Sequence, residues 1–198
     1  IPIPPGVQTT APILDRTFSQ GSGQGYIALA AGSIKNATDE PDSTIATAAQ
    51  GALSFTVTPG SPDPQVLILH THATETYQTW DTPVYDPDFT ARTKDTTLNM
   101  CAVGEAMTKV LNDAGITTLH DTTLHDSPSY TESYARSAQT ARRYLEEYPS
   151  IKVVLDVHRD AMESGDARVR PLTTLDGQPT AQVMIIAGCN NGGTVQLA

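Results

Sequence analysis

The sequence predicts an α/β fold, with a mainly parallel, twisted sheet flanked by helices on both faces, an added hairpin and an irregular N-terminal extension. Between residues 65 and 157, short apolar runs alternate with longer segments of helical period. This order is typical of parallel strands joined by right-handed crossover helices. Residues 1–64 lack it and contain many Gly, Pro, Ser and Thr residues. We therefore expect an extension or linker over residues 1–64 and an α/β domain over residues 65–198.

The extension holds two short apolar clusters, Tyr26 to Leu29 and Leu53 to Val57. We expect them to form one or two edge strands through which a tether joins the fold. The chain starts at Ile1, and no basic and apolar leader pattern follows it. We therefore expect this sequence to begin within a longer protein.

The first half of the predicted domain reads as strand, helix and strand. The run Val66-Leu67-Ile68-Leu69 is apolar on both faces, as in a buried parallel strand. A helix is predicted from about Asp95 to Ala114, with Asp95 as its N-cap and Gly115 at its C-terminal stop. Residues 116–119 then favour a second strand.

The second half continues the pattern and ends in a hairpin. Ser127-Pro128 opens a second predicted helix, which Pro149 ends. Residues 151–157 form a third predicted strand. The turn Asp176-Gly177 is typical of a tight hairpin, whose arms we expect at residues 169–175 and 182–187.

Composition excludes several classes of function. The chain has 198 residues, with 12 Lys and Arg against 22 Asp and Glu, so its net charge is −10. This charge argues against nucleic-acid binding and against attraction to anionic lipids. No apolar run approaches the roughly 18 residues that span a bilayer. The two cysteines, Cys101 and Cys189, are too few for a disulfide scaffold or a four-cysteine zinc site, and they are either paired or free.

The histidines follow the predicted strands. His70 and His72 come after the first strand, His120 after the second and His158 after the third. Because the carboxyl ends of parallel strands share one edge, these imidazoles should meet there. A single histidine at a strand end is more often a solvated or capping residue. Several on converging strands, each near a carboxylate, instead favour a divalent metal site, with zinc the preferred ion.

Spacing selects the candidate ligands. His70 and His72 point to the same face if the strand continues, and His72 and Glu75 meet across one turn if the chain coils there. The preferred ligand set is His72, Glu75 and His158, with His70 as an alternate. Asp156 is expected to orient the imidazole of a neighbouring ligand. The Arg159 guanidinium is placed to pin a peptide carboxylate or to steady a developing oxyanion.

Two other segments leave alternatives open. Residues 120–126 include His120, Asp121, His125 and Asp126, and they either line the cleft or form a capped loop before the second helix. Aromatic residues follow the first histidine pair, and packing within the loop is favoured over a substrate groove. They are Tyr77, Trp80, Tyr85 and Phe89.

Five segments together resemble the stage II sporulation protein P family, which belongs with the zinc-dependent N-acetylmuramoyl-L-alanine amidases. The motifs are His70-Thr71-His72-Ala73-Thr74-Glu75 and Asp156-Val157-His158-Arg159-Asp160, with supporting matches at residues 99–104, 120–128 and 134–137. The resemblance covers about residues 26–188. It implies a zinc-dependent peptidoglycan hydrolase of sporulation (engulfment) that cleaves the muramoyl-L-alanine amide. Endopeptidase activity on the peptide cross-links is a further possibility that the resemblance leaves open. The resemblance further implies a partner similar to the lytic transglycosylase stage II sporulation protein D, and an extracytoplasmic location through a membrane anchor absent from this chain.

The resemblance also implies a glutamate general base near the end of the last core strand. The chain ends about ten residues after Ala187, so we expect the amidase-like catalytic domain to be C-terminally incomplete. Glu163 is the nearest substitute in sequence. A chain without this base would instead be a non-catalytic cell-wall binding or scaffold protein that retains the amidase fold.

The favoured reaction is amide hydrolysis by zinc-activated water, with a carboxylate moving the proton to the leaving amine. A rival among metal hydrolases is the amidohydrolase barrel, whose first strand also carries His-x-His. Its eight strand–helix units typically need about 250 residues, which this chain lacks.

Overall fold

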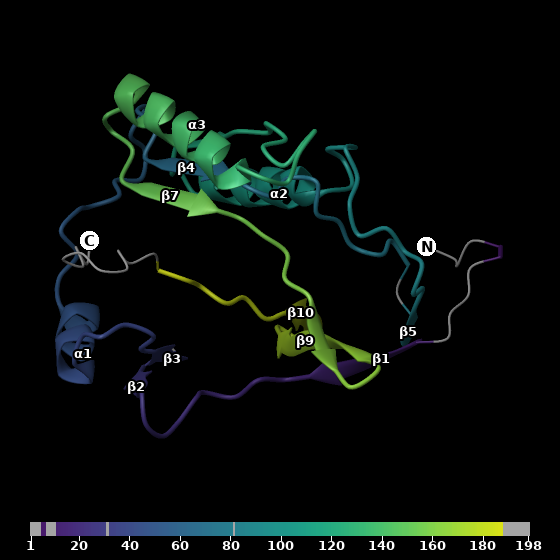
Figure 1. Ribbon diagram of the computed structural model, residues 1–198. Helices are drawn as coiled ribbons and strands as arrows, with labels where there is room; N and C mark the ends of the chain where they lie inside the picture. The colour runs from purple at the N-terminus through teal and green to yellow at the C-terminus, as the bar shows by residue number, and fades with distance from the viewer. Residues whose placement is uncertain (1–4, 7–10, 31, 81, 188–198) are drawn as a thin grey trace. The chain divides into compact units, whose positions relative to one another are not determined.

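The computed structural model describes residues 5–6, 11–30, 32–80 and 82–187 (Figure 1). Its contacts divide the chain into two compact units: residues 1–13 with 55–168, and residues 14–54 with 169–198. These boundaries differ from the division into an extension and a domain that the sequence predicts between residues 64 and 65. That division stays a prediction. Within the described part of the chain, none of the helices combines the length and apolar character that crossing a bilayer requires.

A three-stranded parallel sheet forms the centre of the first unit. Strand β4 (Val66–Leu69) lies between β6 (Thr118–His120) and β7 (Val153–Asp156). The register sets Leu67 of β4 opposite Leu119 on one side and Val154 on the other. All four residues of β4 are buried, as its unbroken apolar run predicts. The prediction of parallel strands in the order strand, helix, strand, helix, strand is therefore confirmed.

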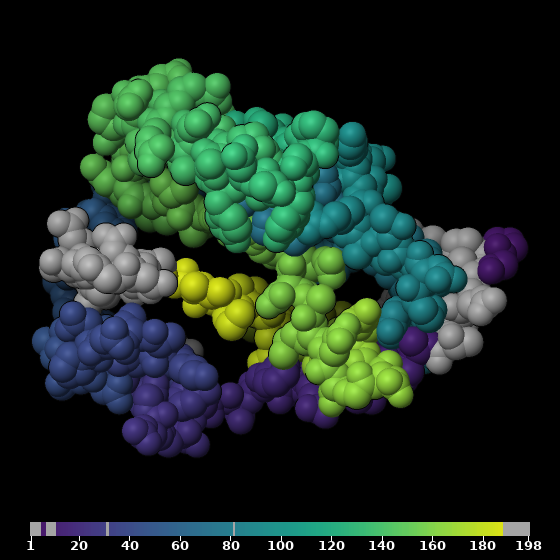
Figure 2. Space-filling view, viewed as in Figure 1, coloured from purple at the N-terminus to yellow at the C-terminus, as the bar shows by residue number. Residues whose placement is uncertain are grey.

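Helix α3 (Ser133–Glu147) covers part of this sheet. Its residues Ala141 and Tyr144 pack against a buried cluster of Leu67, Leu69 and Ile151. The green residues of α3 and the teal residues that precede them form one continuous surface in the space-filling view (Figure 2). This helix face and β4 therefore bury apolar surface against each other.

The second helix of this unit, α2 (Met100–Asp113), begins later than predicted. Asn99 is its N-cap and accepts a hydrogen bond from the backbone N–H of Cys101. The predicted cap Asp95 is wrong, because its carboxylate accepts from the backbone and hydroxyl of Thr97 in a turn before the helix. Gly115 follows the helix with a φ of 81°, as its predicted role as a stop requires.

Helix α3 also starts later than the predicted opening at Ser127-Pro128. Residues 127–132 form turns, and the Arg136 side chain binds the backbone carbonyls of His125 and Ser129. Those carbonyls are thereby satisfied without a helix. The strand bounds differ slightly as well. Strand β6 covers residues 118–120 instead of 116–119, because the N–H of Ile116 donates to the carbonyl of Leu111 at the end of α2. Strand β7 covers residues 153–156 instead of 151–157.

The rest of the first unit includes two short strands. In β5 (Val84–Tyr85), the two residues pair with Pro12 and Ala11 of β1 (Ala11–Arg16). Strand β8 (Met162–Ser164) follows the loop after β7. Isolated bridges join Glu75 to Arg92 and Thr76 to Asn99. The residues just after β4 thereby pair with the later part of the loop that leads to α2.

The second unit contains two hairpins and a helix. Strands β2 (Tyr26–Leu29) and β3 (Gly32–Lys35) pair antiparallel, and helix α1 (Asp42–Gln50) follows them. A strand does form at the first predicted cluster, but it pairs with β3 in a two-stranded sheet and not at the edge of the parallel sheet. Residues 53–57 form no strand, and α1 was not predicted. Ile45 is the buried residue of α1, so the segment shows little of the apolar periodicity that predicts a helix.

The predicted C-terminal hairpin has a different second arm. Strand β9 (Ala167–Leu175) pairs with β10 (Gln178–Ala181), and Asp176 and Gly177 make the turn with φ values of 50° and 77°. The expected arm at residues 182–187 is therefore wrong, since a two-residue primed turn pairs Leu175 directly with Gln178.

Candidate metal centre

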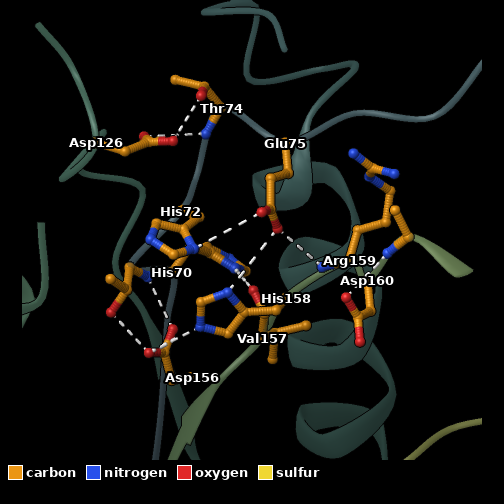
Figure 3. Close-up of polar contacts among 12 residues, drawn as sticks. His70, His72, Thr74, Glu75, Asp126, Asp156, Val157, His158, Arg159 and Asp160 are labelled. Atoms are coloured by element: carbon orange, nitrogen blue, oxygen red, sulfur yellow. Dashed lines mark hydrogen bonds and ion pairs between the residues drawn. The ribbon is translucent and has the colours of Figure 1, made fainter. Parts of the chain in front are cut away.

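Three of the predicted site residues lie together at the carboxyl end of the parallel sheet. His72 and Glu75 lie in the turn after β4, and His158 follows β7 (Figure 3). Each offers one ligand atom, and these atoms lie within 4.8 Å of one another. Glu75 faces both imidazoles, with Oε1 3.7 Å from Nδ1 of His72 and Oε2 3.9 Å from Nδ1 of His158.

The donor set fits a divalent cation. Two imidazoles and one carboxylate are ligands typical of catalytic zinc. The gaps between Glu75 and the two rings are too long for hydrogen bonds. His72 Nε2 is buried and has no hydrogen-bond partner among the described residues. His72 and Glu75 are buried, whereas the His158 side chain is 30% exposed, so solvent reaches the group from the His158 side.

Asp156 orients His158. Its Oδ2 lies 3.0 Å from His158 Nε2, which leaves the other ring nitrogen facing Glu75. Thr71 holds the same carboxylate through its backbone N–H at 2.8 Å and its hydroxyl at 2.7 Å. Asp156 was expected to orient a neighbouring ligand, and in the structure it contacts His158, two residues away on the chain. Such a carboxylate–imidazole pair fixes the ring for metal binding.

The electrostatics follow from these contacts. The hydrogen bond to Asp156 raises the pKa of His158. Burial alone would raise the pKa of Asp156, but the hydrogen bonds from His158 and Thr71 outweigh it and the pKa is lowered. Burial lowers the pKa of His72, which favours the neutral imidazole that a metal ligand must be.

Arg159 borders the cluster. Its backbone N–H donates to Glu75 Oε2 at 3.1 Å, and its guanidinium carbon lies 5.9 Å from the centre of the Tyr77 ring. Its Nε is buried and has no hydrogen-bond partner within the described residues. The neighbouring Asp160 turns into its own loop and accepts from the N–H of Ala161. Arg159 therefore keeps donor capacity beside the cluster.

Arg92 belongs to the site although nothing in the sequence singled it out. Its guanidinium lies 2.7 Å from Asp126 and 3.6 Å from Glu75. Asp126 in turn accepts from the backbone and hydroxyl of Thr74. These contacts hold the turn that carries His72 and Glu75. Arg92 lies in an irregular loop without periodicity, so its place is revealed only by tertiary contacts, among them the antiparallel bridge to Glu75.

His70, the alternate ligand, lies outside the cluster. Its Nδ1–H donates to the carbonyl oxygen of Val157 at 2.8 Å, and its Nε2 lies 3.0 Å from Nε2 of His120. Burial lowers its pKa. Both nitrogens are thus engaged, Nδ1 by the residue that precedes His158 and Nε2 by His120. Gly104 of α2 makes room for this pair, since an added Cβ would lie 2.4 Å from His120 Nε2 and 2.5 Å from His70 Nε2.

The segment 120–126 has two parts: His120 and Thr122 line a hollow of about 410 Å³ that does not include the candidate ligands, whereas other residues hold the structure together. His125 is buried, with Nδ1 2.8 Å from the carbonyl of His70 and Nε2 2.9 Å from the Thr140 hydroxyl. Asp121 lies 3.9 Å from the same imidazole. These contacts fasten the loop to β4 and α3.

The aromatic residues of the loop after β4 divide into two kinds. Trp80 packs edge to face with Phe89 at 6.0 Å, as loop packing predicts. Tyr77 is exposed beside Arg159, and Tyr85 lies 4.9 Å below the guanidinium of Arg168.

Glu163, the predicted substitute base, lies elsewhere in the unit. It forms an ion pair with Arg168 and lines a hollow of about 370 Å³ with Tyr85 and Asp166. It is not in the group formed by His72, Glu75 and His158. Cys101 is buried, and burial raises the pKa of its thiol to about 11, while Cys189 lies outside the described residues.

Comparisons with known proteins agree with the motifs at this site. A family model described as stage II sporulation protein P matches residues 16–196. The curated stage II sporulation protein P of Bacillus subtilis (strain 168) is 27% identical over 129 residues, which cover 62% of this chain and 30% of that protein. The chain therefore spans under a third of the length of the curated relative. No solved structure matches it.

Proposed function

The chain belongs to the stage II sporulation protein P family, and we propose that it carries the metal centre of a zinc-dependent N-acetylmuramoyl-L-alanine amidase acting on peptidoglycan. The observation that carries this proposal is the grouping of His72, Glu75 and His158, with their ligand atoms within 4.8 Å of one another. Two imidazoles, one carboxylate and an exposed side describe a catalytic zinc site better than a structural one.

The chain's own residues have distinct parts in this proposal. His72, Glu75 and His158 would hold the ion, and Asp156 keeps the His158 ring turned toward Glu75. Zinc bound there would polarise an amide carbonyl and lower the pKa of a water molecule to about 7. Arg159, whose Nε has no hydrogen-bond partner in the described structure, would bind a carboxylate or a developing oxyanion of the substrate.

A non-catalytic cell-wall binding protein is the second candidate. The ion pair between Glu163 and Arg168 favours this candidate. In that pair the predicted substitute base lies outside the group of His72, Glu75 and His158. Proton transfer to the leaving amine needs a group within hydrogen-bond reach of the reacting atoms. The two candidates share the fold and the site and differ only in turnover.

The cellular setting is proposed from the family. We propose that the whole protein acts outside the cytoplasm during engulfment, held by a membrane anchor, with peptidoglycan as substrate. A lytic transglycosylase similar to stage II sporulation protein D would supply the complementary cut in the glycan strand. Cleavage of peptide cross-links is a further activity to assay.

Digestion of purified muropeptides separates the candidates. The chain, loaded with zinc, is expected to release free stem peptides, and a chelator should stop the release. Metal analysis of the same sample should give one zinc per chain. Binding to sacculi without any release would support the scaffold instead, and the absence of metal after loading would overturn both the site and the amidase.

A further inference from the structure

A tyrosine with an exposed ring lies over the candidate metal ligands. The Tyr134 ring lies 5.2 Å from the His72 ring, edge to face, and 6.4 Å from the His158 ring in a nearly parallel stack. The residue is nevertheless 62% exposed. An aromatic side chain that contacts both imidazoles while keeping so much surface open is placed to contact whatever binds there.

The position of Tyr134 is set by the same network that orients His158. It lies in the first turn of α3, between the buried Ser133 and Ser137. The Ser137 hydroxyl donates to the Tyr134 carbonyl and lies 2.6 Å from the hydroxyl of Thr71, which binds Asp156. The ring is therefore held on a rigid element, which lowers the entropy lost on binding.

A second ring flanks it. Tyr130 stacks on His72 at 4.5 Å with an interplanar angle of 20°, and the Arg92 guanidinium carbon lies 5.1 Å from the Tyr130 ring centre. Tyr130 is itself 57% exposed. The two tyrosines thus line one side of the cluster, with Arg92 against the Tyr130 ring. Arg159 and Tyr77 border the cluster next to Glu75.

The open face of the Tyr134 ring suits a sugar ring, since the residue is exposed while its ring contacts His72 and His158. The C–H bonds on one face of a pyranose ring carry partial positive charge, which is attracted to the negative face of an aromatic ring.

From this arrangement we propose that Tyr134 is a stacking platform for a pyranose ring of the substrate, on the sugar side of the bond that is cut. The inference rests on the proposed amidase function and deepens it, since it assigns recognition of the sugar to one residue. Stem-peptide carboxylates then fall to the side of Arg159. The residue binds substrate by its ring face, and its hydroxyl takes no part in proton transfer.

Two probes with the same scissile amide test the platform. The first is a disaccharide–tripeptide muropeptide, and the second is D-lactoyl-tripeptide, which lacks the sugar. For the zinc-loaded chain, Tyr134→Ala should raise KM for the muropeptide about tenfold with kcat unchanged, because a binding contact is lost. The lactoyl peptide should be cleaved equally by both proteins, and Tyr134→Phe should match the unsubstituted chain on both probes.

Leu145→Ala is the matched control, since Leu145 is an exposed apolar residue near the other end of α3. It should leave both probes unaffected. Equal losses on both probes in Tyr134→Ala, or a loss of kcat in Tyr134→Phe, would overturn the platform. The second result would assign a chemical role to the hydroxyl.

Failure of the proposed function gives a different result. If the zinc-loaded chain cleaves neither probe, the amidase proposal fails, and equilibrium dialysis of the intact probes then tests the platform alone. Tighter binding of the muropeptide than of the lactoyl peptide, lost in Tyr134→Ala and kept in Tyr134→Phe, supports it. Equal binding of the two probes refutes it.

Discussion

Nε2 of His158 lies 3.0 Å from Oδ2 of Asp156, two residues earlier in the chain. Asp156 is the last residue of β7, opposite Leu69 of β4, so the pair sits where the chain leaves the sheet. The same carboxylate accepts two hydrogen bonds from Thr71, in the segment that leads to His72. One acidic side chain thus fixes the geometry of ligands from two strands.

Asp156→Asn should weaken zinc binding while leaving the chain folded. The amide keeps an acceptor for the Thr71 backbone but removes the anionic partner of His158, and loss of such a partner typically costs about 10–100-fold in metal affinity. Competition with a coloured chelator measures the change. Asp160→Asn is the control, since Asp160 bonds only to Ala161 in the described structure. Unchanged affinity in Asp156→Asn would show that His158 is oriented by other groups.

His72→Ala and His158→Ala should each abolish stoichiometric zinc, whereas His70→Asn should retain it. His70 uses both ring nitrogens for contacts to Val157 and His120, so its loss should instead lower the free energy of unfolding by about 1–3 kcal/mol. Elemental analysis after gel filtration gives the metal content, and urea unfolding gives the stability. Full zinc in either alanine variant would contradict the ligand set.

Gly104→Ala should destabilise the chain even though alanine is the better helix former. Helix propensity alone would stabilise by about 1 kcal/mol. The added Cβ would lie 2.4 Å from His120 Nε2, and such overpacking costs about 1–3 kcal/mol.

Gly51→Ala is its matched control. Gly51 has a φ of −71° and an added Cβ there would meet atoms no closer than 3.4 Å. Urea unfolding should show little change in this variant and a clear loss in Gly104→Ala. A more stable Gly104→Ala chain would mean that the two imidazoles do not pack against α2.

The thiol of Cys101 should resist alkylation in the native chain at pH 9. Burial raises its pKa from 9.0 to about 11, so the thiolate is scarce in the folded state and abundant in the unfolded one. Because the unfolded chain then binds fewer protons, stability should fall as pH rises from about 9 toward 11. Iodoacetamide labelling with peptide mapping, with and without urea, tests the first point.

Unfolding measured across this pH range tests the second point, with Cys101→Ala as the control that lacks the titrating group. The decline should be steeper in the unsubstituted chain than in the variant. Parallel curves, or rapid native labelling at Cys101, would show that the thiol is open to solvent.

The periodicity of apolar residues was sufficient to predict the strands and helices that are buried in the core. The apolar run of β4 is buried on both faces, and Ala141 and Tyr144 of α3 pack on the same sheet. Helix starts were less predictable. Asp95 has the side chain of a good N-cap, yet it accepts hydrogen bonds from Thr97 in a turn. Asn99 is the N-cap of the helix instead. Both residues offer the same hydrogen bond, so only the path of the loop decides between them.

The site divides in the same way. The spacing of His72 and Glu75 predicts that they meet, because a single turn joins them. Arg92 and Tyr134 could not be predicted, since they reach the cluster from a loop and from the first turn of a helix. Glu163 was proposed as a base from its distance along the chain. Its carboxylate pairs with Arg168 in the structure, and its part in proton transfer stays a prediction.

By itself, the sequence determined the parallel strands, the residues that could bind a cation and the family to which the chain belongs. Those features depend on local pattern, on burial and on the chemistry of side chains. The tertiary structure alone decided which imidazoles share Glu75 and which, like His70 and His125, are occupied by hydrogen bonds to the backbone. The physical reason is register: pairing of Leu69 with Asp156 brings His72 and His158 together, and no local signal encodes a pairing between residues so far apart.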